Sequence, residues 1–216
     1  METYRNGEGS PALPADLCDV LRDVETATIG HIEHLGFLAS TIRPVFPAKI
    51  AGRALTVAAP GRDGTVIYSA IDRLISGDVL VIARVDQDDI ACVGGGVATA
   101  AKARGATAII VDGPCTDAEE IREIGLPVWC KGVSAKTTNR MYRIGGSINL
   151  PIACGGAAVL PGYAILADES GIFAASPAHM HLLAVHAIER QKRSEKLRPH
   201  LAAGRSIFEI TQGEHQ

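Results

Sequence analysis

The sequence predicts a single α/β domain with a layered core, and three observations support that fold class. Short apolar runs alternate with helical patterns between about residues 50 and 130, which is typical of an α/β core. After residue 125 the pattern changes to short strands separated by turns, which favours a compact layered domain over an open doubly wound sheet. The 216 residues contain no internal repeat and no linker long enough to divide the chain into two domains.

The N-terminal part is expected to contain a tail and two helices. Residues 1–12 are rich in Gly, Pro and Glu, and we expect them to form a flexible tail. A helix should begin at Pro14, because apolar residues follow it at helical spacing. These residues are Leu17, Val20 and Leu21. A second, short helix or turn should begin at Thr28 and end near Gly36.

The central stretch should alternate strands and helices. Residues 79–83 form a continuous apolar run, typical of a strand buried on both faces. The helix that starts at Gly64 should end near Ile75, and the helix after the glycine run 94–96 should be closed by Gly105. The first of these helices should bury Val66, Ile67, Ala70, Ile71 and Leu74. The expected strands are 53–58, 79–83, 90–93 and 108–111.

The C-terminal half should combine short strands with one long helix. The helix should begin at Pro177 and run to about Leu201, with a solvated segment at 191–196. The chain is therefore divided into a flexible tail (1–12), an α/β domain (13–176) and a C-terminal helical extension (177–216). The expected strands are 127–129, 147–149, 151–153, 164–166 and 172–174.

Composition excludes several classes of function. The net charge of -3 and the aromatic fraction of 4% do not favour a nucleic-acid partner. No apolar run is long enough to span a membrane, and the polar N-terminus does not resemble a signal peptide. The cysteines lie far apart in the sequence without CxxC spacing, so we expect the reduced thiols of a cytoplasmic protein. They are Cys18, Cys92, Cys115, Cys130 and Cys154.

The glycine run Gly94-Gly95-Gly96, followed by Val97, stands between an expected strand and an expected helix. Glycine leaves the backbone open, and amides at a helix N-terminus attract anions, so a carboxylate or phosphate would fit here. The alternative is a tight turn that permits close packing. The residues alone balance these two interpretations evenly.

Asp117 follows a buried strand and a glycine turn, at an expected helix start. Because aspartate is among the best N-cap residues, a capping role is the interpretation that the residue favours by itself. Asp168 lies in a turn-forming segment with Gly171, and we assign it a structural role.

Four stretches, taken in order, resemble the RraA-like family, which includes the 4-hydroxy-4-methyl-2-oxoglutarate aldolases and regulators of RNase E. Their order and spacing match over most of residues 25–176. The resemblance implies a three-layer β/β/α domain that assembles as a homotrimeric ring or as a homohexamer of two stacked rings. The stretches are GRALTV with SGDVLVI (52–57 and 76–82), GGGVATAAKARG (94–105), DGPCTD with GLPV (112–117 and 125–128), and LPGY with ADESGI (160–163 and 167–172).

The resemblance also implies a site. In related aldolases the glycine amides bind the substrate carboxyl, which assigns that role here to Gly94, Gly95, Gly96 and Val97. The matching aspartate binds magnesium (Mg²⁺) or manganese (Mn²⁺), partly through waters, so Asp117 is the candidate metal ligand. With its neighbour Thr116 it forms the candidate catalytic pair.

Two residues depart from the aldolase pattern. Thr116 stands where aldolases carry an arginine that steadies the enolate, and Gly95 stands where an acidic residue is common. Another cation would have to replace the arginine, although surface exposure is the ordinary role of such residues. The candidates are Arg53, Arg62, Arg122, Lys136 and Arg140. Among the histidines, most of which we expect to be structural, His31 is the one expected to border the site.

The leading expectation is a divalent-metal-dependent lyase, an aldolase or decarboxylase that acts on a small 2-oxo acid through an enolate. One alternative is a related metal-dependent tautomerase or dehydratase. Another is a non-catalytic, protein-binding regulator of the RNase E type. Asp117 and the open glycine turn favour an enzyme, whereas the missing arginine favours the regulator.

Overall fold

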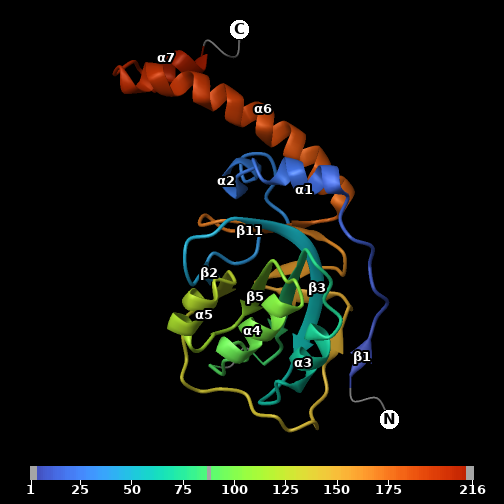
Figure 1. Ribbon diagram of the computed structural model, residues 1–216. Helices are drawn as coiled ribbons and strands as arrows, with labels where there is room; N and C mark the ends of the chain where they lie inside the picture. The colour runs from blue at the N-terminus through green and yellow to red at the C-terminus, as the bar shows by residue number, and fades with distance from the viewer. Residues whose placement is uncertain (1–3, 87–88, 213–216) are drawn as a thin grey trace.

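The computed structural model describes residues 4–86 and 89–212 and has the three-layer β/β/α arrangement that the resemblance implied (Figure 1). Its central sheet is built on β3 (Ile50–Ala59), β4 (Asp78–Arg84), β5 (Ala108–Asp112) and β6 (Val128–Cys130), which pair in that order and in parallel. Every residue of β4, β5 and β6 is buried, as the continuous apolar runs predict for strands covered on both faces.

Short strands extend the two edges of this sheet. Next to β6, β2 (Arg43–Pro44) runs antiparallel. At the other edge, β7 (Ser147–Ile148) pairs with β3, and β1 (Arg5–Asn6) pairs with β7. Composition predicted a flexible tail over residues 1–12, but within that segment Arg5 and Asn6 pair with Ser147 and Ile148.

Three helices cover one face of the sheet: α3 (Thr65–Ile71), α4 (Gly95–Ala103) and α5 (Ala118–Ile124). The face predicted for the first of these helices is buried in the core between the helices and the sheet. The α-helical part of α3 ends at Ile71, four residues earlier than expected, although Leu74 still packs in the core. Gly105 follows α4 with φ 84°, as its expected closing role requires.

The second face of the sheet is covered by strands. The hairpin β8 (Ile152–Cys154) and β9 (Ala157–Val159) packs against it, and β10 (Ala164–Ala167) pairs with both β3 and β11 (Ile172–Ala175). The strand β9 was not predicted from the sequence. A usable signal was present in the pair Gly155-Gly156, because two glycines can adopt the positive φ of a tight hairpin turn, as both do here.

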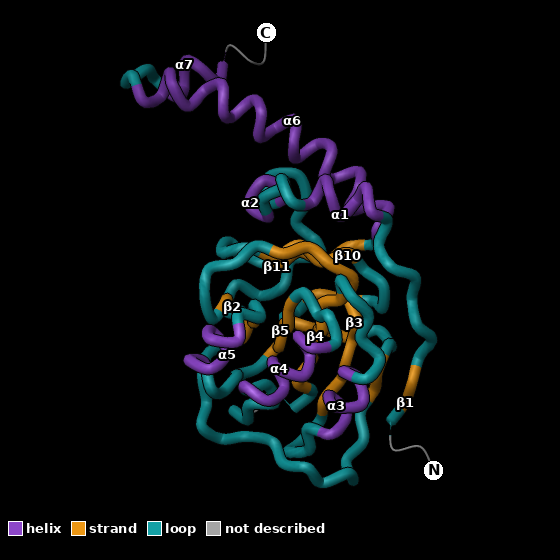
Figure 2. The backbone as a smooth tube through the Cα atoms, viewed as in Figure 1, coloured by secondary structure: helices purple, strands orange, loops and turns teal. Residues whose placement is uncertain are grey.

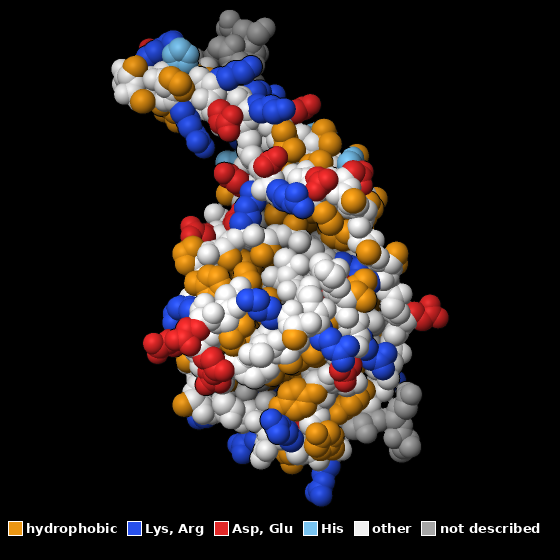
Figure 3. All heavy atoms as spheres, in the orientation of Figure 1, with side chains coloured by type: hydrophobic (Ala, Val, Ile, Leu, Met, Phe, Trp, Pro, Cys, Tyr) orange, Lys and Arg blue, Asp and Glu red, His pale blue; other side chains and the backbone are white. Residues whose placement is uncertain are grey.

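The terminal helices form a further layer over β10 and β11. In this layer, α1 (Ala15–Leu21) and the first half of α6 (Pro177–Ala202) bury a common apolar cluster, and α2 (Thr26–Ile29) lies beside them. Ser176 caps α6 by accepting from the amide of His179. The second half of α6 and α7 (Ile207–Gln212) extend away from the body (Figures 1 and 2) and carry charges of both signs (Figure 3).

One expected strand is wrong. Residues 90–93 form only isolated bridges, Ala91 with Thr137 and Val93 with Cys115. The physical reason is the order of the sheet, because β4 and β5 are direct neighbours and leave no place between them. The segment therefore runs along the end of the sheet, where it leads directly into α4.

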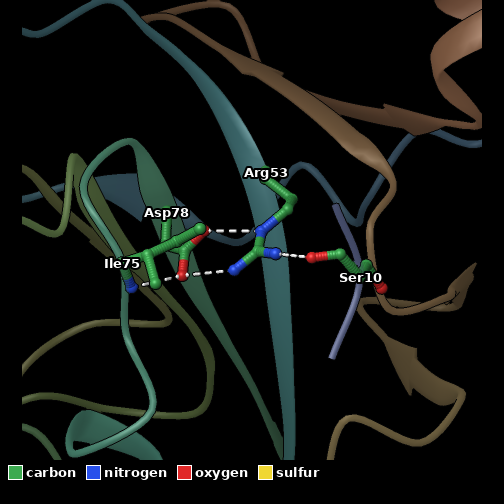
Figure 4. A network of polar contacts seen from close by, with 4 residues as sticks. All are labelled: Ser10, Arg53, Ile75 and Asp78. Carbon is green, nitrogen blue, oxygen red and sulfur yellow. Dashed lines mark hydrogen bonds and ion pairs between the residues drawn. The ribbon is translucent and has the colours of Figure 1, made fainter. Parts of the chain in front are cut away.

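A buried ion pair ties the start of β3 to the start of β4 (Figure 4). Arg53 Nε and Nη2 lie 2.7 and 2.8 Å from the two carboxylate oxygens of Asp78, which also accepts from the amide of Ile75 at 2.9 Å. Arg53 also donates to the carbonyl of Ser10, so the N-terminal segment is fixed to the same network. Removing either charged partner would leave a buried charge without compensation.

Candidate functional site

A pocket of about 320 Å³ lies at the N-terminus of α4. The helices α3 and α4, the turn before α5 and the segment 137–140 together form its wall. Five of the six residues predicted from the sequence line it: Gly94, Gly96, Val97, Thr116 and Asp117. The remaining lining residues are Tyr68, Ile71, Ala91, Cys92, Val93, Ala100, Thr137, Thr138 and Arg140.

The glycine run permits close packing at two of its residues and leaves the third open. A Cβ at Gly94 would lie 2.5 Å from Asp117 Oδ2, and a Cβ at Gly95 would lie 2.0 Å from Glu120 Cδ. These two glycines therefore permit close packing of carboxylates against the backbone. At Gly96 nothing lies within 4 Å of a Cβ position, so this residue is open to a ligand.

Of the first amides of α4, one donates to a protein side chain and two lie at the pocket. Gly95 is buried and its amide donates to Asp117 Oδ2 at 3.2 Å. Helix geometry leaves the next two amides, of Gly96 and Val97, without an acceptor inside the helix. Both of these residues line the pocket, where their amides and the helix dipole favour an anion.

Asp117 occupies the N-cap position of α5 but does not cap that helix with its side chain. The carboxylate lies against α4, where it accepts from Gly95, and its second oxygen accepts from Thr116 Oγ1 at 3.2 Å. Its backbone has φ 52° and ψ 43°, a left-handed conformation that costs free energy in a residue other than glycine. The capping interpretation is therefore wrong for the side chain, which remains exposed beside the pocket.

Glu120 is a candidate site residue that was not predicted from the sequence. It follows Asp117 by three residues in the first turn of α5, a spacing that places two side chains on one face of a helix. The empty position beside Gly95 accommodates its carboxylate. The signal that could have revealed Glu120 is this spacing, together with the missing side chain at Gly95.

Of the five cations considered as replacements for an arginine at position 116, Arg140 alone lines this pocket in the part of the chain that the structure describes. Its guanidinium lies 5.8 Å from the ring centroid of Tyr68, and the hydrogen bond with Tyr68 raises the pKa of Arg140. Arg53 is held by Asp78, and Lys136 lies 3.3 Å from Asp89. Arg62 and Arg122 are exposed elsewhere.

The segment that carries Arg140 is fastened by Asp63, which is 1% exposed. One carboxylate oxygen accepts from the amide and hydroxyl of Thr65 and from the amide of Met141, and the other from the amides of Arg143 and Ile144. Burial by itself raises the pKa of Asp63, but these hydrogen bonds outweigh it and hold the pKa well below its usual range.

The remaining candidates from the sequence lie away from this pocket. His31 lines a separate groove between α2 and α6, with Arg190 and Arg198. Asp168 has the structural role expected of it, since its carboxylate accepts from Thr26, Ser170 and Gly171. A cavity of about 440 Å³ beside Asp168 is larger than the α4 pocket but contains none of the predicted site residues. None of the described helices is both long and apolar enough to cross a membrane.

The family of this chain is shown by its match to a model of known proteins. The chain matches the RraA-like family (Aldolase/RraA) over residues 14–174. It belongs to the RraA-like family. The match includes strands β3 to β6 of the central sheet, its covering helices and every residue of the α4 pocket.

Individual relatives agree with this assignment. A protein of Halalkalibacterium halodurans, named as a candidate 4-hydroxy-4-methyl-2-oxoglutarate aldolase, is 30% identical over 73% of this chain and 75% of its own length. A protein of Burkholderia multivorans with the same name is 30% identical over 73% of this chain and 92% of its own. The solved structure of Streptomyces coelicolor RraAS2, described as an unusual member of the RNase ES inhibitor RraA family, superposes with a TM-score of 0.76. It is 24% identical, over 89% of this chain and 98% of its own.

Proposed function

We propose that the protein is a divalent-metal-dependent lyase, of the aldolase or decarboxylase type, that acts on a small 2-oxo acid in the α4 pocket. The observation that carries the proposal is the position of the Asp117 carboxylate, exposed at the N-terminus of α4 beside two amides that favour an anion. The names of the aldolase relatives supply the reaction class.

Asp117, which lines the pocket, and Glu120, three residues later, are the carboxylates that would hold a magnesium or manganese ion. Asp117 and Glu120 lie against consecutive residues of the glycine run, so they offer hard oxygen donors from one face of α5. Mg²⁺ typically takes one or two carboxylates and completes its shell with water and substrate oxygens, which an exposed site permits. When bound, such a cation would act as a Lewis acid on a 2-oxo-carboxylate.

Other protein groups around the pocket would bind the substrate, stabilise the developing charge and position the Asp117 carboxylate. The amides of Gly96 and Val97 would bind the substrate carboxylate and orient its oxo group. Arg140 would supply the positive charge that Thr116 lacks and so stabilise the negative charge that develops when the carbon–carbon bond breaks. Thr116 donates to Asp117 and would act as a positioning residue for that carboxylate.

Calorimetric titration with oxalate, a mimic of the enolate of pyruvate, tests the proposal. The wild-type protein should bind oxalate when magnesium is present and lose that binding when the metal is chelated. An absence of oxalate binding at millimolar concentrations, with either magnesium or manganese, would reject the proposal. Product analysis on 2-oxo acids then separates a lyase from a tautomerase or dehydratase, which would share the binding step.

A second candidate function is that of a non-catalytic, protein-binding regulator. The neutral side chain of Thr116 favours it, because the pocket lacks a cation adjacent to Asp117 in sequence. A regulator of this kind would not bind oxalate in a metal-dependent manner, so the same titration distinguishes the two functions.

We further propose a cytoplasmic homotrimer or homohexamer. On α6, Leu183 and Ile188 pack against the domain, whereas Leu182 and Val185 remain 64% and 44% exposed. A second copy of the chain would cover these two residues. Light scattering at micromolar concentration should therefore give a mass of at least three chains of 22.6 kDa, and a monomer mass would reject the assembly.

A further inference from the structure

Two cysteines that are distant in sequence meet beside the α4 pocket. Cys115 follows β5 and Cys130 ends β6, and their sulfur atoms lie 3.4 Å apart. Their side chains belong to residues that are 0% and 4% exposed, and both thiols are free. The parallel pairing of β5 with β6 creates this contact, which the spacing of the cysteines in the sequence did not reveal.

The backbone holds the two sulfur atoms in a fixed frame. The amide of Cys115 donates to the carbonyl of Gly132 at 2.9 Å, and the carbonyl of Cys115 accepts from the amide of Ser134 at 2.9 Å. The thiol of Cys130 also contacts the carbonyl of Gly132 at 3.3 Å. The segments 115 and 130–134 are therefore fastened to each other on both sides of the thiol pair.

We propose that Cys115 and Cys130 form a modification site, at which a hydroperoxide converts the two thiols into a reversible disulfide that weakens ligand binding in the α4 pocket. The disulfide itself stands on the geometry of the thiol pair. Its effect on ligand binding rests on the proposed function.

The chemistry needs only the oxidant and the two thiols. The sulfur of Cys130 attacks one oxygen of the hydroperoxide, which breaks the O–O bond, releases water or an alcohol and leaves a sulfenic acid on Cys130. The sulfur of Cys115 then displaces the hydroxyl group of that sulfenic acid as the S–S bond forms, and the hydroxyl leaves as water with the proton of the Cys115 thiol. The sulfurs together lose two electrons, which reduce the peroxide. A dithiol returns both thiols to the reduced state and becomes a disulfide itself.

We expect the oxidant to reach Cys130 before Cys115, because Cys130 is 4% exposed and Cys115 is 0% exposed. The residues that follow Cys130, which are Lys131, Gly132 and Val133, lie on the surface. Two other cysteines lie elsewhere: Cys18 is on α1, and the thiol of Cys154 contacts the carbonyl of Ile82 on the second face of the sheet. Cys18, which is partly exposed, provides a control thiol outside the pair.

The bond would act on the pocket through one residue. A disulfide has an S–S length of about 2.05 Å, so the sulfurs must approach each other by more than about 1 Å. Cys115 directly precedes Thr116 and Asp117, and the amide of Thr116 donates to the carbonyl of Val93, which precedes Gly94. A displacement at Cys115 is thus transmitted to the Asp117 carboxylate and to the glycine run together.

The first experiment treats the full-length protein with hydrogen peroxide and maps its peptides by mass spectrometry without reduction. We expect a loss of about 2 Da and a cross-linked peptide pair that contains Cys115 and Cys130, both reversed by dithiothreitol. Cys18→Ser should leave the cross-link unchanged, whereas Cys130→Ser should abolish it. Gains of about 16 Da on single cysteines, a different cross-link, or no reaction would each overturn the modification site.

The peptide map of the wild-type protein tests the disulfide even if Cys130→Ser does not fold. Cys115→Ala is a second variant that should also abolish the cross-link.

The second experiment titrates oxalate with magnesium into reduced, oxidised and re-reduced protein. We expect oxidation to weaken the affinity on the order of tenfold to a hundredfold, and dithiothreitol to restore it. Equal affinity in the reduced and oxidised forms would overturn the coupling. Failure of every form to bind oxalate would reject the proposed function and leave the disulfide intact.

Discussion

The turns around Asp117 and Asp168 contain the same kind of residue and use it in opposite ways. At Asp168, the carboxylate oxygens accept from the amide and hydroxyl of Thr26 at 2.8 and 2.6 Å and from the amide of Ser170 at 2.8 Å. At Asp117, the carboxylate has two longer hydrogen bonds of 3.2 Å and remains exposed beside a pocket. A carboxylate saturated by protein donors holds the fold, whereas one with free lone pairs is available for a ligand.

The largest effect that follows from this contrast is expected at Asp117. Asp117→Asn keeps a residue that tolerates the left-handed backbone but removes the charge, so magnesium-dependent oxalate binding should fall by about a hundredfold or more. Thermal stability should change little, because the side chain is exposed and does not cap α5. Calorimetric titration and thermal denaturation measure the two quantities.

Asp168→Asn is the matched control for that variant. Because it removes the charge from a carboxylate that fastens α2, it should lower the free energy of unfolding by about 1–3 kcal/mol while oxalate binding stays unchanged. If the two variants behave alike, in either measurement, the contrast between the two turns is mistaken.

The next largest effect concerns the positive charge. Arg140→Met keeps much of the length of the side chain and removes its charge, so the rate of carbon–carbon bond cleavage should fall on the order of a hundredfold. Steady-state kinetics on a 2-oxo acid substrate measure this. The double variant Arg140→Met, Thr116→Arg should recover part of the rate, because it places a positive charge at the position where the resemblance implies an arginine in aldolases. An unchanged rate in Arg140→Met would remove Arg140 from the proposed mechanism.

Asp63 extends the comparison to a third aspartate, which is buried and saturated by five hydrogen bonds. Its pKa is lowered in the folded state, so its contribution to stability is present above the pKa of the unfolded chain, about 4. That contribution is lost as the pH falls below this value. Urea denaturation should therefore show a steeper acid loss of stability in the wild type than in Asp63→Asn. Parallel curves would contradict this role.

More of the fold than of the candidate site could be predicted from the sequence. Buried strands such as β4 carry a continuous apolar signal that needs no partner to be recognised, and the resemblance supplied the layering. The strand expected at 90–93 failed because sheet order is set by tertiary pairing rather than by local pattern. At the site, Gly94–Val97 and Asp117 followed from motif order. Glu120 had a local signal in its spacing from Asp117. The hydrogen bonds of Asp63 to the segment 141–144 and the Cys115–Cys130 contact depend instead on which loops meet at one end of the sheet, and local spacing does not encode that.

The smallest effect is expected at Thr116, whose hydroxyl donates to Asp117 Oδ1. Thr116→Val keeps the shape of the side chain, including the methyl group beside Gly94, and removes this one hydrogen bond. A hydrogen bond to a charged group contributes about 1.5 kcal/mol or more, so the loss of affinity for oxalate with magnesium should be about tenfold, well below that of Asp117→Asn. Thr116→Ser keeps the hydroxyl and should bind oxalate as the wild type does. Equal binding by Thr116→Val and the wild type would show that Asp117 needs no orientation by its neighbour. A loss as large as that of Asp117→Asn would instead make Thr116 a direct ligand-binding residue.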